Sequence, residues 1–271
     1  MTHIIGIGVL CLLFLLHWQA SIIGQSILLH RGATHNQFTF TQKKYMHYAY
    51  WYLFFSMGPS YLSPRAYALL HRMHHRYADE DLDPHKPTRS FFGPIKMIIN
   101  TAKPYSDAYR HRDWMRVGDG CIYIRNAHDE NIMRWDAFDR IAHSWLMRLG
   151  WALVYILVYY QLLVVFQLPL WLLPIVAVHI FMGPIHGMIV NYFAHMYGDS
   201  PHSMSNSSRN MPPLVRKLLQ LKGELYHNNH HKFPQAPDFS LGQGIDGSYI
   251  IMKWLEKRGV ININNLHKVA Y

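Results

Sequence analysis

Three long apolar stretches dominate the hydropathy pattern of this chain. Residues 4–29, 149–168 and 170–190 contain no Asp, Glu, Lys or Arg. Because about 20 apolar residues in a helix can cross a bilayer, each stretch is predicted to be a transmembrane helix, the last two joined by a tight turn at Pro169. The first stretch is longer than the apolar part of a signal peptide and follows no basic segment, so we interpret it as a span.

The remaining segments are mostly polar and basic, and we expect them to form a helical cap. The cap comprises residues 65–145 and 196–271, with a short strand within 117–124 and an amphipathic helix at 135–145. The turn at Pro169 lacks Lys and Arg, whereas the outer flanks of the two spans are rich in them. Since Lys and Arg mark the cytoplasmic side, the cap is predicted to be cytoplasmic, and residues 1–271 to form a single multi-pass domain.

Two sets of histidines share the pattern His-x-x-His-His. They stand at His71, His74 and His75, and at His227, His230 and His231. On a helix, positions i, i+3 and i+4 leave one face within a turn, so the three imidazoles of a set can converge on a metal. We interpret the two sets as opposite walls of one metal site.

Other histidines stand at the ends of two predicted spans. His30 and His35 would lie about 140° apart around an α-helix, so both can reach one metal only if the helix ends between them, and Gly32 is the expected end. Asn191 and His195 share a helix face where the third span ends. We expect His195 to bind metal too, with Asn191 holding a water or a ligand by a hydrogen bond.

The aromatic segment 45–63 could pass for a fourth span. A crossing there would place the histidines before it and those after it on opposite sides of the membrane and prevent a common site. Tyr and Trp favour the membrane surface, so we predict an interfacial or re-entrant segment broken near Gly58 and Pro59. The expected fold is an all-α integral membrane protein with three to four membrane helices and a histidine-rich site in its cap.

Composition narrows the chemistry of that site. The chain has 271 residues and 20 His but only two cysteines, Cys11 and Cys121, which excludes a disulfide framework and a Cys-based zinc site. Its net charge of +10 is carried beside apolar spans, so we attribute it to membrane flanks and not to nucleic-acid binding. The metal ligands must therefore be His or carboxylate.

The motifs supply more histidines than one ion can take. The nine are His30, His35, His71, His74, His75, His195, His227, His230 and His231. Nine ligands suit two ions, and imidazole accepts Zn, Cu, Fe and Ni. A carboxylate-bridged di-iron site needs two Glu-x-x-His motifs, but only Glu224 with His227 fits, so Glu224 is expected to support a ligand. The acidic residues of segment 79–83 either orient ligand rings as well or form a solvated loop.

The order of these motifs resembles that of the membrane-bound fatty acid desaturases. The matching stretches are His-Arg-x-x-x-His from His30, His-Arg-x-His-His from His71 with a later Asp-Pro-His, Asn-x-x-x-His-x-Tyr-Gly from Asn191, and Gly-Glu-x-x-His-Asn-x-His-His from Gly223. Between about His30 and Phe233 the chain looks most like the acyl-CoA delta-9, stearoyl-CoA desaturase-like branch in its bacterial form. The resemblance implies a di-iron centre with the nine histidines as ligands and Asn191 contacting iron through water.

The resemblance also implies a reaction and its partners. Two Fe2+ ions and O2 would insert a cis double bond into a long-chain acyl-CoA or acyl lipid in a bacterial inner membrane, with water as co-product. The chain contains no His-Pro-Gly-Gly stretch of an attached haem domain, so a separate donor similar to cytochrome b5, ferredoxin or rubredoxin is expected. The chemistry is consistent, since an unactivated methylene offers no acidic proton or leaving group to acid, base or nucleophile.

The chain departs from relatives at three places. Leu70 stands where many relatives have Asp, residues 32–34 replace a bulkier Trp-containing stretch, and one span instead of two precedes the first motif. Cations that could hold an anionic head group, unless they simply face lipid, are Arg31, Lys43, Lys44 and Arg65.

Two other functions compete with desaturation. A di-iron hydroxylase of alkyl, sterol or carotenoid substrates would begin with the same hydrogen abstraction. A metal transporter would line its spans with histidines, whereas only His179 and His186 lie in mid-span. We interpret these two as neutral imidazoles paired with neighbouring helices, and Gly183 and Gly187 as positions of close helix packing.

Overall fold

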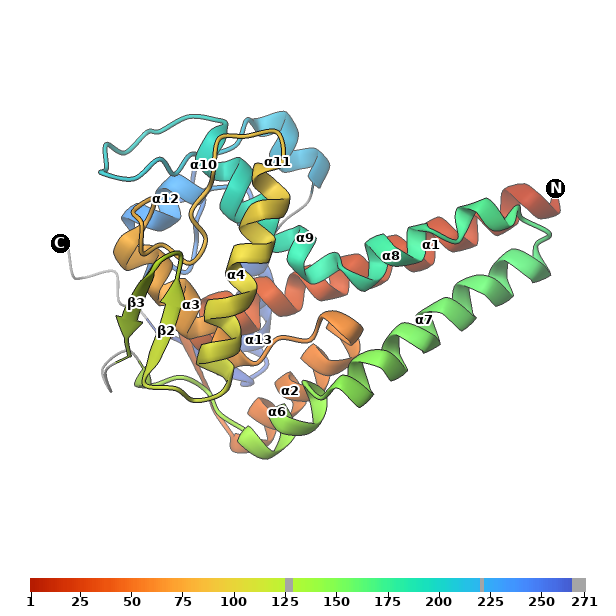
Figure 1. Ribbon diagram of the computed structural model, residues 1–271, viewed down its shortest axis with the longest axis horizontal. Coiled ribbons are helices and arrows are strands. Elements are labelled where there is room, and N and C mark those ends of the chain that lie inside the picture. The colour runs from red at the N-terminus through yellow and green to blue at the C-terminus, as the bar shows by residue number, and fades with distance from the viewer. Residues whose placement is uncertain (125–128, 220–221, 265–271) are drawn as a thin grey trace.

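The computed structural model describes residues 1–124, 129–219 and 222–264. Helices α1, α7 and α8 extend together as a long arm with the N-terminus at its tip, and the other elements gather into a cap at the opposite end (Figure 1). In chain order, with η marking π- or 3-10 helices, the elements are α1 (Thr2–Ile23), η1 (Gly24–Thr34), β1 (Phe38–Phe40), α2 (Lys43–Met57), η2 (Gly58–Ser60), α3 (Pro64–Tyr77), α4 (Gly93–Tyr109), β2 (Trp114–Val117), β3 (Gly120–Tyr123), α6 (Asp136–Ala142), α7 (Trp145–Val165), η3 (Leu170–Leu172), α8 (Ile175–Ile180), α9 (Met182–Met188), η4 (Ile189–Phe193), α10 (Ala194–Met196), α11 (Pro213–Leu219), α12 (His227–Lys232), α13 (Gly247–Lys257) and β4 (Ile261–Ile263).

Among the described residues, two helices are each long and apolar enough to cross a membrane. The first runs without interruption through α1 and η1, from Thr2 to Thr34, and the second is α7. Only 17% of the apolar window of each is buried, so these helices present apolar side chains outward, as helices in lipid do. They correspond to the predicted spans at 4–29 and 149–168.

The third predicted span is not a straight helix. Its two parts, Leu170–Ile180 and Met182–Met196, meet at 63°, so the predicted span over 170–190 qualifies only as part of a bent pair of helices, which is a broken span or a re-entrant loop. Pro184 explains the break, because a proline has no N–H to donate to the carbonyl four residues earlier and its ring crowds that carbonyl. The part before the bend lies along the arm, and the part after it turns into the cap (Figure 1).

The aromatic segment forms α2 and then η2. Helix α2 ends at Met57, and Gly58 has a φ of 51°, which matches the predicted break. The Tyr52 hydroxyl of α2 donates to the Ala20 carbonyl of α1 at 2.9 Å. Among the described residues, α2 is not one of the candidate membrane spans, and its placement at the interface stays a prediction.

The cap is mostly helical but holds two small antiparallel sheets. One is the hairpin of β2 and β3, with Trp114 opposite Tyr123, in the region where a short strand was predicted. The other pairs β1 with β4, with Phe38 opposite Ile263. The all-α expectation is therefore too narrow, because β1 and β4 are three residues each and pair over more than 200 residues of sequence.

Candidate metal centre

The first histidine pair spans the end of a widened helix, since His30 lies on η1 and His35 is the residue that follows its last position. The His35 N–H bonds to the His30 carbonyl at 3.2 Å, and the Thr34 hydroxyl donates to the Leu29 carbonyl at 3.0 Å. This is π-helical winding, in which residues i and i+5 are bonded and return to nearly the same face. The helix therefore ends between the two histidines as predicted, but at Thr34 instead of Gly32, and both rings face one region, with centroids 5.0 Å apart.

The two His-x-x-His-His sets lie on α3 and α12 and divide between two groups. A first group contains one ligand atom each from His30, His35, His71, His75 and His230, and a second from His74, His195, His227 and His231; within each group these atoms lie within 4.8 Å of one another. The i and i+4 residues of each set therefore share a group, while the i+3 residue turns to the other. A set does not converge on one metal as the spacing suggested.

The Nε2 atoms within each group face one another. In the first group, Nε2 of His230 lies 2.9 Å from Nε2 of both His30 and His75. In the second, Nε2 of His227 lies 3.0 Å from that of His195 and 3.1 Å from that of His231. Convergence of several imidazole nitrogens on a common point is the arrangement that a metal ion requires.

Burial keeps these imidazoles neutral. Burial first, and neighbouring histidines next, lower the pKa well below 6.5 for His35, His71, His75, His227, His230 and His231. Nε2 of His35 is buried and has no hydrogen-bond partner among the described residues. Neutral imidazole with a free lone pair is the form that binds metal, so the residues fit two divalent first-row metal ions.

Carboxylates hold three of the rings from behind. Nδ1 of His30 lies 2.5 Å from Glu224, Nδ1 of His74 2.8 Å from Asp83, and Nδ1 of His195 3.1 Å from Asp79. Such partners fix the tautomer and direct Nε2 toward a metal. Burial alone would raise the pKa of Glu224, but His30 and Arg31 lower it to about 2.

The acidic segment 79–83 is only partly a ligand support. Asp79 and Asp83 contact histidine rings as described, and Asp83 also accepts hydrogen bonds from the N–H groups of Asp79 and His85. Asp81 instead pairs with Lys86 at the surface. The sequence could not separate these residues, because their order along the loop says nothing about which side faces the helices.

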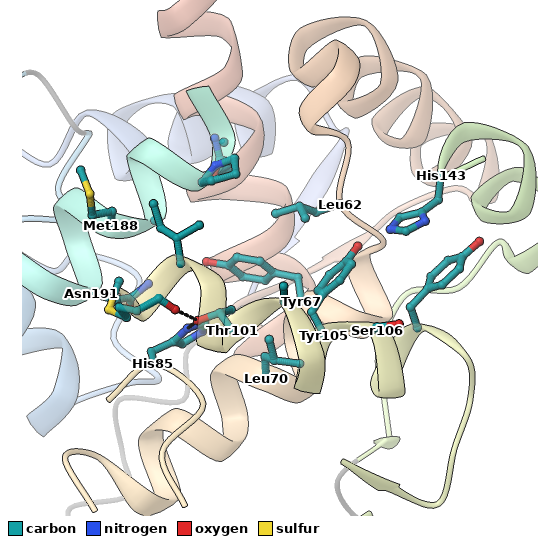
Figure 2. A pocket seen from close by; sticks show the side chains of 18 of the residues that line it. Leu62, Tyr67, Leu70, His85, Thr101, Tyr105, Ser106, His143, Met188 and Asn191 are labelled. Carbon is teal, nitrogen blue, oxygen red and sulfur yellow. Dashed lines mark hydrogen bonds between the residues drawn. The ribbon is translucent and has the colours of Figure 1, made fainter. Parts of the chain in front are cut away.

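A cavity of about 620 Å³ lies beside the histidines. Its wall includes Tyr67, Leu70, His85, Thr101 and Asn191 (Figure 2). The Tyr67 ring stacks on His71 of the first group at 5.9 Å, and the His85 ring lies 5.5 Å from His74 of the second. Tyr67 and His85 therefore link the cavity wall to the two groups, although none of the nine histidines lines the cavity itself.

Leu70 and Asn191 line the cavity and were already singled out in the sequence, as were Gly183 and Gly187 for helix packing. Oδ1 of Asn191 is buried without a hydrogen-bond partner among the described residues, so it can hold a water or a ligand group. Leu70 supplies apolar wall. The rest of the lining carried no pattern that could have been found beforehand, because it comes from α3, α4, α7 and α9.

Two of the four candidate head-group cations are occupied elsewhere. Arg31 is completely buried and pairs with Glu224 and Asp246. Arg65 pairs with Asp129 and donates to the Ala108 carbonyl. Neither can meet a head group, whereas Arg110 and Arg148, which the sequence did not single out, line the cavity.

The mid-span histidines lie apart from both groups. Nε2 of His179 is 2.8 Å from Nδ1 of His17 on α1, and its Nδ1 is 2.8 Å from the Tyr159 hydroxyl on α7, so His179 pairs with neighbouring helices as predicted. His186 is buried, and its Nε2 has no partner among the described residues. Gly183 packs closely as expected, since a Cβ there would lie 2.9 Å from Cβ of Ser60.

Comparison with known proteins identifies the class. A family profile described as fatty acid desaturase matches residues 5–244. This chain therefore belongs to the fatty acid desaturase family, a family of oxidoreductases, and the resemblance seen in the sequence is confirmed.

Individual relatives are distant but span most of the chain. The chain is 26% identical to the acyl-CoA C20 Delta5-desaturase of Anemone leveillei, over 91% of this chain and 70% of that protein. It is 25% identical to the hex-5-enoyl-(acyl-carrier protein) acetylenase of Moorena producens (90% and 73%) and 26% identical to the delta-9 desaturase-like 4 protein of Arabidopsis thaliana (83% and 64%). The names of these relatives give different positions of the new bond and different acyl carriers, so the delta-9 position is not confirmed.

Proposed function

We propose that this chain uses O2 to insert a cis double bond into a long saturated acyl chain, at the delta-9 position of an acyl-CoA. The observation that carries the proposal is the pair of histidine groups, five and four residues, lying beside one cavity. We propose that the nine histidines hold two Fe2+ ions. Bound iron would supply the activation of O2 that removal of hydrogen from a methylene requires.

The residues of the chain would do the rest by positioning and exclusion of water. The cavity volume of about 620 Å³ lies within the roughly 300–1,000 Å³ typical of small-molecule sites. Leu70 and Met97 give it apolar wall, and its lining residues Tyr67 and His85 contact one histidine of each group. An acyl chain in this cavity would present adjacent methylenes to both groups.

The same proposal includes the membrane in which the protein lies and the side from which electrons arrive. The two apolar helices support insertion in a membrane, which we propose to be a bacterial inner membrane with the cap on the cytoplasmic side. A separate electron donor would then reach the cap from the cytoplasm. Reporter fusions at the turn near Pro169 and after Ile263 test this, because the turn should report from outside and the C-terminal fusion from inside.

The reaction is tested by expressing the chain with an electron donor and analysing cellular lipids by mass spectrometry with localisation of double bonds. A new delta-9 monounsaturated chain, absent from cells with the His230→Ala variant, is the expected result. A double bond elsewhere would correct the position only. A hydroxylated product, heavier by one oxygen, would overturn desaturation in favour of the di-iron hydroxylase.

A further inference from the structure

A buried charged cluster lies behind the first histidine group and extends past the residues matched by the family profile. Its centre is Arg31, which is 0% exposed. The guanidinium donates to Glu224 at 2.5 Å and to Asp246 at 2.8 Å and lies 3.7 Å over the ring of Phe239. One cation is thus held between two carboxylates and a ring.

Asp246 links this cluster to two histidines by separate routes. Through Arg31 it holds Glu224, whose other oxygen meets Nδ1 of His30. It also accepts the Phe239 N–H at 2.9 Å, and the Phe239 ring lies 4.2 Å from the ring of His230. His30 and His230 both belong to the first group.

The chain is built closely around this carboxylate. Asp246 is 3% exposed and caps α13 by accepting the Tyr249 N–H at 3.0 Å. A Cβ on Gly223, which precedes Glu224, would lie 2.4 Å from an Asp246 oxygen, so only glycine allows this approach. Asp246 is therefore fixed against the motif that carries Glu224 and His227.

We propose that Asp246 is a positioning residue for the first metal ion, acting on His30 through Arg31 and Glu224 and on His230 through Phe239. This inference rests on the proposed two-metal site. The second group is held by different carboxylates, Asp79 and Asp83. Loss of Asp246 should therefore weaken the binding of the first ion and leave the binding of the second unchanged.

The test is iron binding by the purified full-length chain in detergent, measured as iron per chain and as the affinity of each ion. Wild type should hold two ions. Asp246→Asn keeps the shape but leaves Arg31 with one carboxylate, and we expect one ion to bind about 10–100-fold more weakly, the usual effect of removing a group that holds a metal ligand. Glu256→Gln, which alters the exposed pair with Lys253 on the same helix, should retain both ions at full affinity.

Two further variants keep the inference falsifiable. Phe239→Leu should weaken the same ion even if Asp246→Asn fails to fold, and Asp83→Asn combined with Asp246→Asn should weaken both ions. The inference would be overturned if Asp246→Asn or Phe239→Leu retained both ions at wild-type affinity. It would also be overturned if either of these single variants bound both ions equally weakly.

The experiment also separates this inference from the proposed reaction. A wild-type chain that holds two irons but forms no double bond would end the proposed reaction while the positioning role stands. A wild-type chain that holds fewer than two irons would overturn both.

Discussion

The Ser60 hydroxyl donates a hydrogen bond to the Ile180 carbonyl, with 2.5 Å between the two oxygens. Pro184, four residues after Ile180, cannot donate to that carbonyl, so the turn after α2 supplies the missing donor. The same hydroxyl accepts the Gly183 N–H at 3.3 Å. Ser60 therefore stabilises the bend that carries Asn191 and His195 toward the histidine groups.

Replacing Ser60 with Ala should destabilise the protein by about 1–3 kcal/mol, the cost of leaving a buried polar group unpaired. Thermal unfolding of the purified protein measures the loss. Ser90→Ala, at an exposed position, is the matched control. Equal melting temperatures for the two variants would show that the bend does not depend on Ser60.

His230→Ala should abolish activity and reduce bound iron while leaving membrane insertion intact. Nε2 of His230 faces both His30 and His75, so its removal opens the first group. Iron content, product formation and recovery in the membrane fraction are measured together. His111→Ala removes a half-exposed imidazole outside both groups and should behave as wild type. Full activity of His230→Ala would refute its role as a ligand.

Asp83→Asn and Asp81→Asn should differ although they are two residues apart. Asp83 is buried and holds His74, whereas Asp81 is exposed and pairs only with Lys86 among the described residues. We expect Asp83→Asn to lower the affinity for one iron about 10–100-fold and Asp81→Asn to leave the affinity for both unchanged. Equal iron affinities in titrations of the two variants would contradict the role of Asp83.

The metal-free protein should lose stability as the pH falls below about 6.5. Burial holds the pKa of six histidines, among them His71 and His230, well below that value. The unfolded chain then binds more protons than the folded one, and protonation favours unfolding. Glu224, with a pKa of about 2, adds to this loss below its ordinary pKa. Asp139, with its pKa raised by burial to about 6, and Asp246, whose pKa burial also raises, act in the opposite direction but are two groups against six.

Melting temperatures of the metal-free protein between pH 8 and pH 5 test this dependence. We expect a steady decrease toward pH 5. A melting temperature that stayed constant or rose over this range would mean that the histidines are not buried in neutral form.

Gly187→Leu should change which acyl chains the enzyme accepts. Gly187 lines the cavity, and a Cβ there would meet only the Asn191 amide nitrogen, at 4.0 Å, so a larger side chain can enter without a clash at its base. Conversion of the longest acyl chains should fall more than that of shorter ones, as measured with substrates of graded length. Gly150→Leu, on α7 with open space around it, is the control, and an unchanged length profile in Gly187→Leu would place the acyl chain elsewhere.

The sequence alone determined the family and the local elements that carry its histidines. Helix periodicity and charge-free length are properties of contiguous residues, so the spans at 4–29 and 149–168 and the helical sets beginning at His71 and His227 could be predicted. The break at Gly58 followed from local backbone preference. The order of the histidine motifs sufficed to predict the family.

The tertiary structure decided how those parts meet. The division of each histidine set between two groups depends on what packs opposite, such as Asp83 behind His74. The spacing did not show the π-helical winding between His30 and His35, and the Ser60 hydroxyl completes the bend that Pro184 begins. The Arg31 cluster and the cavity join residues from distant parts of the chain. A spacing fixes only the face of a helix from which side chains leave, and contacts between elements fix where they point.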